Sequence, residues 1–118
     1  MADTAFNIDD AFHYLRKREE KQAIVREKRR LELLPRVISI LSEELTGHDV
    51  ELFLIGSILH PYKFNHYSDI DIVLKNYQGD RFCLWTALEA KIGLPIEVIL
   101  YEECHFQKEI IDQGLKVL

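Results

Sequence analysis

The sequence predicts an α/β domain with a small mixed central sheet flanked by helices, preceded by a long N-terminal helix. The chain has 118 residues, of which 47% are hydrophobic, enough to form one core. Apolar stretches at 50–56, 69–74 and 95–101 have the length and composition of strands. Segments with helical spacing of apolar residues precede, separate and follow these strands, and this alternation is typical of layered α/β domains.

The first predicted helix begins after Asn7, a residue type that favours the N-cap position. Its apolar content is low as far as Pro35, where we expect the helix to kink or break. Apolar residues then recur at helical spacing, and Gly47 is suited to end the helix in a left-handed conformation. We therefore predict a charged helical extension at 1–33 and a compact domain at 34–118.

Later elements follow from the same signals. A second helix is predicted at 80–92 and a last one at 102–113, with a short extended segment at 115–118. The side chains of the last helix that we expect to face inward are Phe106, Ile110 and Ile111. About twelve residues connect the first two strands, which admits a crossover or a loose hairpin, so the strand directions stay open.

Charge is distributed unevenly along the chain. The net charge is −5, yet residues 16–30 hold eight basic and three acidic residues. Such asymmetry suits a polyanionic partner such as RNA, or a solvated helix with ion pairs between neighbouring side chains, for example those of Glu27. Acidic residues are mixed into the run and no aromatic residue interrupts it, so we favour the solvated helix over nucleic-acid binding.

The sequence lacks the patterns of a membrane span, a secretory signal and a cysteine metal site, and we infer the compartment and the redox state of the cysteines from this. No apolar run approaches the roughly 18 residues that a membrane span needs, and "MADTAFNIDD" lacks the basic-then-apolar order of a secretory signal. We therefore expect a soluble cytoplasmic protein. Cys83 and Cys104 have no His or Cys at metal-ligand spacing, and we expect them to be small core residues rather than a disulfide.

Two carboxylates occur on the strand predicted at 69–74. Because side chains alternate along a strand, Asp69 and Asp71 share one face. Neighbouring carboxylates repel each other unless a cation lies between them. Glu97 occupies the equivalent face of the third strand and joins the two aspartates if the strands are neighbours. Three oxygen ligands at one place would suit Mg²⁺ or Mn²⁺.

Gly56 and Ser57 end the first strand and form the second half of the candidate site. A strand that turns there into a helical start exposes backbone N–H groups, which together with the helix dipole favour phosphate. Gly56 lets a phosphate approach, and the Ser57 hydroxyl can donate to it. Only Lys63 or His60 could add positive charge nearby, and we interpret His60 and His66 as ordinary surface residues. An anion site beside metal-binding carboxylates suits a nucleoside triphosphate and in-line displacement at phosphorus.

The stretches "LIGSILHPYKFNHYSDIDIVL" and "PIEVILYEECHFQKEIIDQGLKVL" resemble the minimal nucleotidyltransferase (MNT) family of the DNA polymerase β-like superfamily. The resemblance covers residues 34–118 and implies the nucleotidyltransferase fold. It implies that a nucleoside monophosphate, AMP from ATP in our expectation, is transferred to a hydroxyl of a macromolecule. The catalytic metal ligands implied by the resemblance are Asp69, Asp71 and Glu97, the last at a position that is usually Asp. The residues it implies for binding the triphosphate are Gly56 and Ser57, to which we add Lys63.

The resemblance also implies a partner. Many small members of the family are similar to antitoxins paired with a HEPN-type ribonuclease toxin, and some add AMP to a tyrosine of that toxin. We therefore expect a HEPN-type helical partner or self-association. The family usually has a basic residue and a further glycine after Gly-Ser, whereas residues 58–61 are Ile-Leu-His-Pro here. This departure supports an alternative, a catalytically impaired binding module that masks a helical partner protein.

Overall fold

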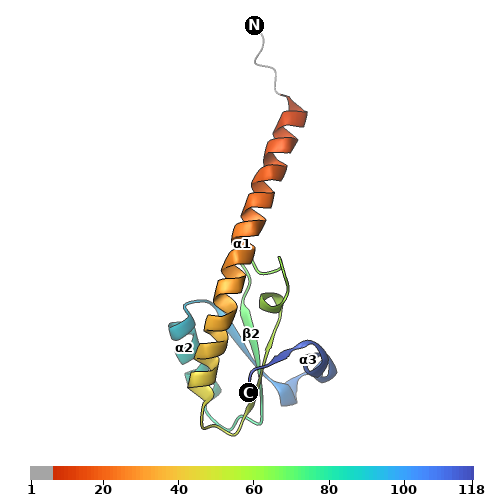
Figure 1. The fold of residues 1–118 in the computed structure, drawn as a ribbon. Coiled ribbons are helices and arrows are strands. Elements are labelled where there is room, and N and C mark those ends of the chain that lie inside the picture. Colours follow the sequence, from red (N-terminus) through yellow and green to blue (C-terminus); the bar gives the residue numbers. More distant parts are fainter. Residues whose placement is uncertain (1–6) are drawn as a thin grey trace.

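The computed structural model describes residues 7–118 and shows a four-stranded sheet with three α-helices and two short 3₁₀ helices (Figure 1). The elements in chain order are α1 (Ile8–Leu45), β1 (Glu51–Ile55), η1 (Ser57–Leu59), β2 (Ile70–Lys75), α2 (Arg81–Ile92), β3 (Ile96–Leu100), η2 (Tyr101–Glu103), α3 (Gln107–Gln113) and β4 (Leu115–Lys116). The prediction of a mixed α and β architecture with a long N-terminal helix is confirmed.

The sheet is mixed, as the sequence predicts. The strand order is β3-β2-β1-β4, with β1 antiparallel to β2 and to β4, and β2 parallel to β3. The connection between β1 and β2 is therefore a long hairpin rather than a crossover. The tail forms the short edge strand β4, and the Leu52 N–H donates to the carbonyl of Leu118. The expected extended segment at the C-terminus is thus present.

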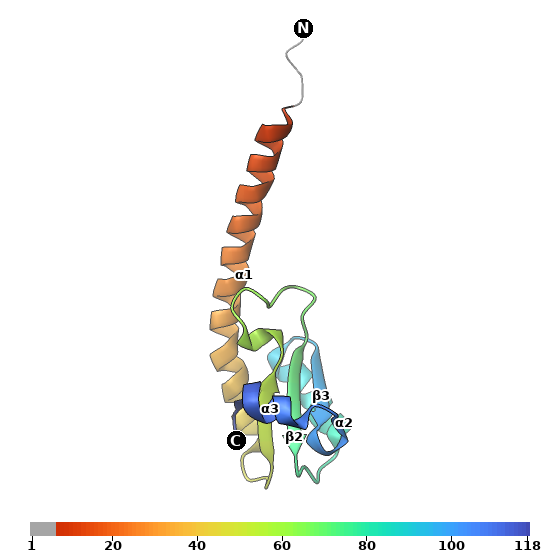
Figure 2. The ribbon, with the colours of Figure 1, turned by 90° about the vertical axis from the view of Figure 1, so that its right-hand side faces the viewer.

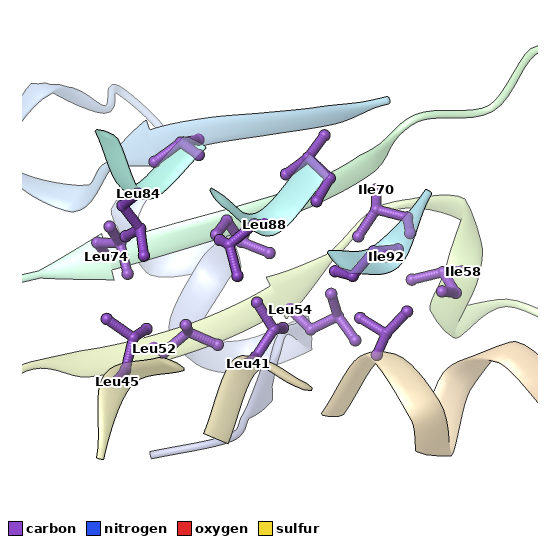
Figure 3. Packing of buried hydrophobic residues seen from close by; sticks show 14 of the residues in the cluster. Leu41, Leu45, Leu52, Leu54, Ile58, Ile70, Leu74, Leu84, Leu88 and Ile92 are labelled. Carbon is purple, nitrogen blue, oxygen red and sulfur yellow. The ribbon is translucent and has the colours of Figure 1, made fainter. Parts of the chain in front are cut away.

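Helices α1 and α2 lie on one side of the sheet, and α3 lies on the other (Figures 1 and 2). The main core fills the space between the sheet and the first two helices, and Figure 3 shows its interdigitated side chains. Its fully buried members include Leu41, Leu45, Leu52, Leu54, Ile58, Ile70, Leu74 and Leu88. A smaller cluster of Phe53, Val73 and Ile110 holds α3 on the opposite face.

The ends of the helices follow local rules. The side chain of Asn7 accepts hydrogen bonds from the N–H groups of Asp9 and Asp10, as its N-cap role predicts. Asp80 caps α2 in the same way by accepting from two N–H groups of the first turn. Gly93 ends α2 in the left-handed conformation. These caps confirm the helix boundaries expected at 7 and 93.

The expected break at Pro35 is wrong, because α1 continues through the proline to Leu45. A proline removes one helical hydrogen bond, but Leu33 and Val37 on either side are buried in the main core and hold both turns in place. Tertiary packing thus outweighs the local penalty. The boundary expected between residues 33 and 34 falls inside this single helix, and residues 1–6 of the predicted extension lie outside the described residues.

The last helix is shorter than expected. The segment predicted as one helix at 102–113 contains η2 at its start, and α3 begins only after Phe106. Ile110 is buried, but Phe106 and Ile111 are 41% and 50% exposed, so their expected inward positions are wrong. A seven-residue helix lying on a sheet presents little more than one position to it. Cys83 is also exposed, on the outer side of α2, and not a core residue; Cys104 is half-buried.

The N-terminal part of α1 extends well beyond the sheet (Figure 1), and the longest dimension of the structure is 73 Å. Side chains that this projecting part leaves exposed include Ile8, Phe12 and Leu15. None of the helices within residues 7–118 has the length and apolar character that crossing a membrane requires.

Candidate active site

Asp71 and Glu97 are register partners on the adjacent parallel strands β2 and β3. On its other side, Asp71 is paired with Ile55 of β1. Paired residues point to the same face of a sheet, and this face is the one that α3 covers, since Phe53 and Val73 are also paired on it. The sequence-based condition that Glu97 lies beside Asp71 is therefore met. Asp69 precedes the first residue of β2 and is exposed.

The charges of this site are uncompensated. Asp71 is half-buried, and burial together with the nearby Glu97 and Asp69 carboxylates raises its pKa from 3.8 to about 6. None of the ion pairs in the described part of the chain involves any of the three carboxylates. A half-buried carboxylate next to two others, without a basic partner, is electrostatically suited to a cation.

The donor set fits a hard divalent cation only in part. Carboxylate oxygens are the ligands that Mg²⁺ and Mn²⁺ prefer, with water and phosphate oxygens completing the coordination. Across residues 7–118, however, no three His, Cys, Asp or Glu side chains gather closely enough to hold a metal ion by themselves. Asp71 and Glu97 are the adjacent pair, and the three-ligand set with Asp69 stays a prediction.

Gly56 lies directly against Asp71. Its backbone has φ +87° and ψ −162°, a conformation essentially restricted to glycine. A Cβ atom at this position would lie 2.6 Å from Oδ2 of Asp71. The glycine therefore lets the backbone pass next to the carboxylate, and the predicted phosphate corner and the predicted metal ligand are neighbours in space.

The helical start expected after Gly56 is only the single 3₁₀ turn η1. So short a turn has little macrodipole, so the expected dipole contribution is wrong. The hydrogen bonds of the turn are donated by the N–H groups of Leu59 and His60, to the carbonyls of Gly56 and Ser57. The N–H groups of Ser57 and Ile58 take no part in them. Ile58 is fully buried, so the N–H and hydroxyl of the partly exposed Ser57 are the donors of this corner that a phosphate can reach.

A partly buried ion pair on α1 holds this turn in place. Arg30 is only 5% exposed, and its guanidinium donates to the Ile58 carbonyl at 2.9 Å and to both carboxylate oxygens of Glu27 at 2.7 and 2.8 Å. Glu27 also accepts from the N–H of Tyr62 at 2.8 Å. The hydrogen bond from Arg30, followed by that from Tyr62, lowers the pKa of Glu27 to about 2.

The roles of Arg30 and Glu27 were not apparent in the sequence. Both belong to the charged run that was interpreted as a solvated helix with ion pairs. The expected pairing of Glu27 with a nearby basic side chain is present, but the solvated surroundings are wrong for Arg30, which is buried. A pair three residues apart in such a run looks like any surface pair. Only the fully buried Ile58, which anchors η1 in the core, brings a carbonyl within reach of the guanidinium.

The basic and imidazole side chains of the loop are peripheral. Lys63 is exposed in the turn at 61–63, and its expected contact with a triphosphate stays a prediction. His66 is exposed, as expected, and lies 3.4 Å from a guanidinium nitrogen of Arg29 on α1. His60 is also exposed, at the end of η1, and borders a small cavity between η1 and α3.

In comparisons with known proteins, no family model, curated protein or solved structure matches this chain. The functional interpretation therefore depends on the residues of the site and their geometry.

Proposed function

We propose that this chain is a metal-dependent nucleotidyltransferase that transfers AMP from ATP to a hydroxyl group of a macromolecule. The observation that carries the proposal is the register pairing of Asp71 with Glu97, combined with Gly56 next to Asp71. Two carboxylates and a glycine–serine corner meet on one face of the sheet. This combination serves to hold a nucleoside triphosphate by its phosphates.

The residues of the site divide into two groups by chemistry. Asp71 and Glu97, with Asp69, are the oxygen ligands for Mg²⁺ or Mn²⁺. The N–H and the hydroxyl of Ser57 donate to phosphate oxygens. The bound cation supplies charge stabilisation at the phosphates and acidifies the attacking hydroxyl. The raised pKa of Asp71 agrees with this division, because a half-buried carboxylate surrounded by acids favours any state in which positive charge is near.

The transfer balances as a substitution at phosphorus. The acceptor oxygen forms a bond to the α-phosphorus, and the bond from that phosphorus to the pyrophosphate oxygen breaks. Pyrophosphate leaves, and the hydroxyl proton passes to a carboxylate of the site. Glu97 is exposed on β3 and is the member of the pair that an incoming acceptor can reach.

The acceptor in this proposal is a helical partner protein of the HEPN ribonuclease type, in a toxin–antitoxin pair. Support comes from the shape of the chain. The described residues contain no second domain that closes over the carboxylates, and the projecting part of α1 presents Ile8, Phe12 and Leu15 to solvent. An exposed apolar helix face on a chain with an open site suits a macromolecular acceptor.

The direct test supplies the chain with Mg²⁺, ATP labelled at the α-phosphate, and lysate or a candidate partner. We expect label in a protein band together with release of pyrophosphate. The Asp69→Asn/Asp71→Asn double variant should abolish both. Glu97→Gln should lower turnover by orders of magnitude with a smaller effect on ATP affinity. Transfer that survives the double variant, or no transfer from ATP to any protein, would overturn the proposal.

The projecting part of α1 also supports a second candidate function, a binding module that masks a helical partner without catalysis. Ile58 follows Ser57, where the family that the sequence resembles usually has a basic residue, and the exposed apolar residues of α1 provide a surface for the partner. The two functions differ in one measurement. A masking module binds and silences its partner equally well in wild-type form and as the Asp69→Asn/Asp71→Asn variant, whereas a transferase variant loses the effect.

A further inference from the structure

A cavity of about 180 Å³ lies between η1 and α3, and Gly56 is part of its wall. Because Gly56 also contacts Asp71, the cavity opens next to the corner where the phosphates are proposed to bind. On the α3 side the wall includes Phe106, Glu109 and Gln113. On the η1 side it includes His60, at the end of that turn. None of the three carboxylates lines this cavity, so the proposed chemistry gives no role to most of its wall.

The size of the cavity limits what it can hold. Sites that enclose a drug-sized ligand measure roughly 300–1,000 Å³. A volume of about 180 Å³ is smaller, so it admits one flat ring system and not a whole nucleotide. A ligand that reaches both the cavity and the phosphate corner must therefore be extended, with a ring at one end and anionic groups at the other.

The walls suit a planar ring with polar edges. Leu59 and Ile110 provide apolar surface, and Phe106 provides an aromatic face that is 41% exposed. Phe106 also lines the depression that Glu97 lines, so this residue borders both the cavity and the surroundings of that carboxylate. An exposed aromatic side chain can stack with any nucleobase, because every base has a π-face.

The polar side chains of the wall are free to recognise a ring edge. The hydrogen bonds found among residues 7–118 include none from the side chains of His60, Glu109 or Gln113. An ionised glutamate only accepts hydrogen bonds, whereas a glutamine both donates and accepts. An acceptor-only group beside an amide matches a ring edge that carries an amino group next to a ring nitrogen.

We infer that this cavity is the base-binding pocket of the nucleoside triphosphate, with Phe106 stacking on the base and Glu109 accepting from its exocyclic amino group. The inference rests on the proposed function, because it assumes that the phosphates lie at Gly56 and Ser57. The pocket selects bases that have an amino group, such as adenine, over uracil, which presents a carbonyl oxygen at that position.

The test measures binding of three probes by calorimetry in Mg²⁺: ATP, UTP and inorganic tripolyphosphate. Tripolyphosphate occupies only the phosphate corner, so it separates the two halves of the site. We expect wild type to prefer ATP to UTP. Phe106→Ala should lower the affinity for ATP at least about fivefold, as loss of one stacked base predicts. The affinity for tripolyphosphate should stay unchanged. Glu109→Gln should narrow the difference between ATP and UTP.

Each variant has a matched control. Phe82→Ala removes an aromatic ring that is 72% exposed on α2, away from the cavity, and should leave all three affinities unchanged. Asp112→Asn removes one negative charge, as Glu109→Gln does, but at an exposed position of α3 outside the cavity wall. This variant should keep the preference for ATP over UTP. Circular dichroism of each variant establishes that the fold is retained.

The outcomes separate the pocket from the proposed function. If tripolyphosphate binds to wild type but Phe106→Ala and Glu109→Gln leave ATP and UTP unaffected, the pocket is wrong and the phosphate corner stands. If Phe106→Ala lowers the affinity for tripolyphosphate as much as that for ATP, the ring supports the fold of the site and does not bind a base. If neither nucleotide nor tripolyphosphate binds to wild type, the proposed function fails and the pocket fails with it.

Discussion

Gly56 and Asp71 are in direct contact: an added Cβ at the glycine would lie 2.6 Å from Oδ2 of the aspartate. Gly56 directly follows β1 and Asp71 lies in β2, so the whole hairpin loop separates them along the chain. Their contact joins the proposed phosphate corner to the carboxylates, and it gives both residues measurable roles in stability as well as in the proposed chemistry.

The first prediction concerns Gly56→Ala. The variant forces a strained backbone on alanine at φ +87° and also brings its methyl group against Asp71. We expect a loss of about 2–3 kcal/mol in the free energy of unfolding, measured with urea. Gly47→Ala is the control, since φ there is +89° but no atom lies within 4 Å of the added carbon. Equal losses in both variants would show that the contact with Asp71 has no energetic consequence.

The second prediction concerns the pH dependence due to Asp71. Its pKa in the folded state is about 6, above the ordinary 3.8, so folding favours the protonated form. Ionisation therefore reduces stability as the pH rises from about 4 through about 6. In buffer with a chelator, we expect Asp71→Asn to be more stable than wild type by about 1–2 kcal/mol at pH 7.5, after allowance for solvent screening.

This stabilising effect of Asp71→Asn should fade toward pH 4, where the wild-type carboxyl is protonated as well. Added Mg²⁺ should raise the unfolding temperature of wild type at pH 7.5 and leave that of the variant unchanged. A stability difference that stays constant from pH 4 to 7.5 would contradict the raised pKa.

The third prediction concerns Arg30. Replacing it by Ala leaves the buried Ile58 carbonyl without its donor, and an unsatisfied buried acceptor costs about 1–3 kcal/mol in the free energy of unfolding. We expect weaker triphosphate binding too, because the guanidinium fixes η1. Arg26→Ala, which breaks a more exposed pair with Glu19, should have little effect on either property.

The ion pair of Arg30 contributes to stability over a different pH range from Asp71. Because the pKa of Glu27 is lowered to about 2, the stabilisation from this pair is complete above about 4.5 and is lost as the pH falls toward 2. The difference in the free energy of unfolding between wild type and Arg30→Ala should therefore shrink as the pH falls from about 4.5 to 2, leaving the part due to the hydrogen bond from Arg30 to the Ile58 carbonyl. Parallel curves down to pH 2 would be inconsistent with the pair.

The fourth prediction concerns Ser57→Ala. One hydrogen bond to a charged phosphate is removed, so the affinity for tripolyphosphate in Mg²⁺ should fall by about 1–2 kcal/mol. Ser57 is only partly exposed but makes no side-chain hydrogen bond within the described residues, so stability should change little. An unchanged affinity in calorimetry would leave only the backbone N–H of Ser57 as a phosphate donor.

The sequence by itself determined the local features of this protein. Asn7 and Gly93 set helix ends through their own capping chemistry, and alternation along 69–74 put Asp71 and Ile72 on opposite faces. These properties depend on neighbours within a few residues, which is the range over which spacing and residue type are informative.

Only the tertiary structure decided which distant residues meet. The pairing of β2 with β3 brought Glu97 to Asp71, and the burial of Ile58 converted Arg30 from a surface charge into the support of η1. Packing on both sides of Pro35 kept α1 continuous against local propensity, and the position of α3 over the sheet created the cavity at Phe106. These outcomes depend on burial and long-range register, which no local pattern of residues encodes.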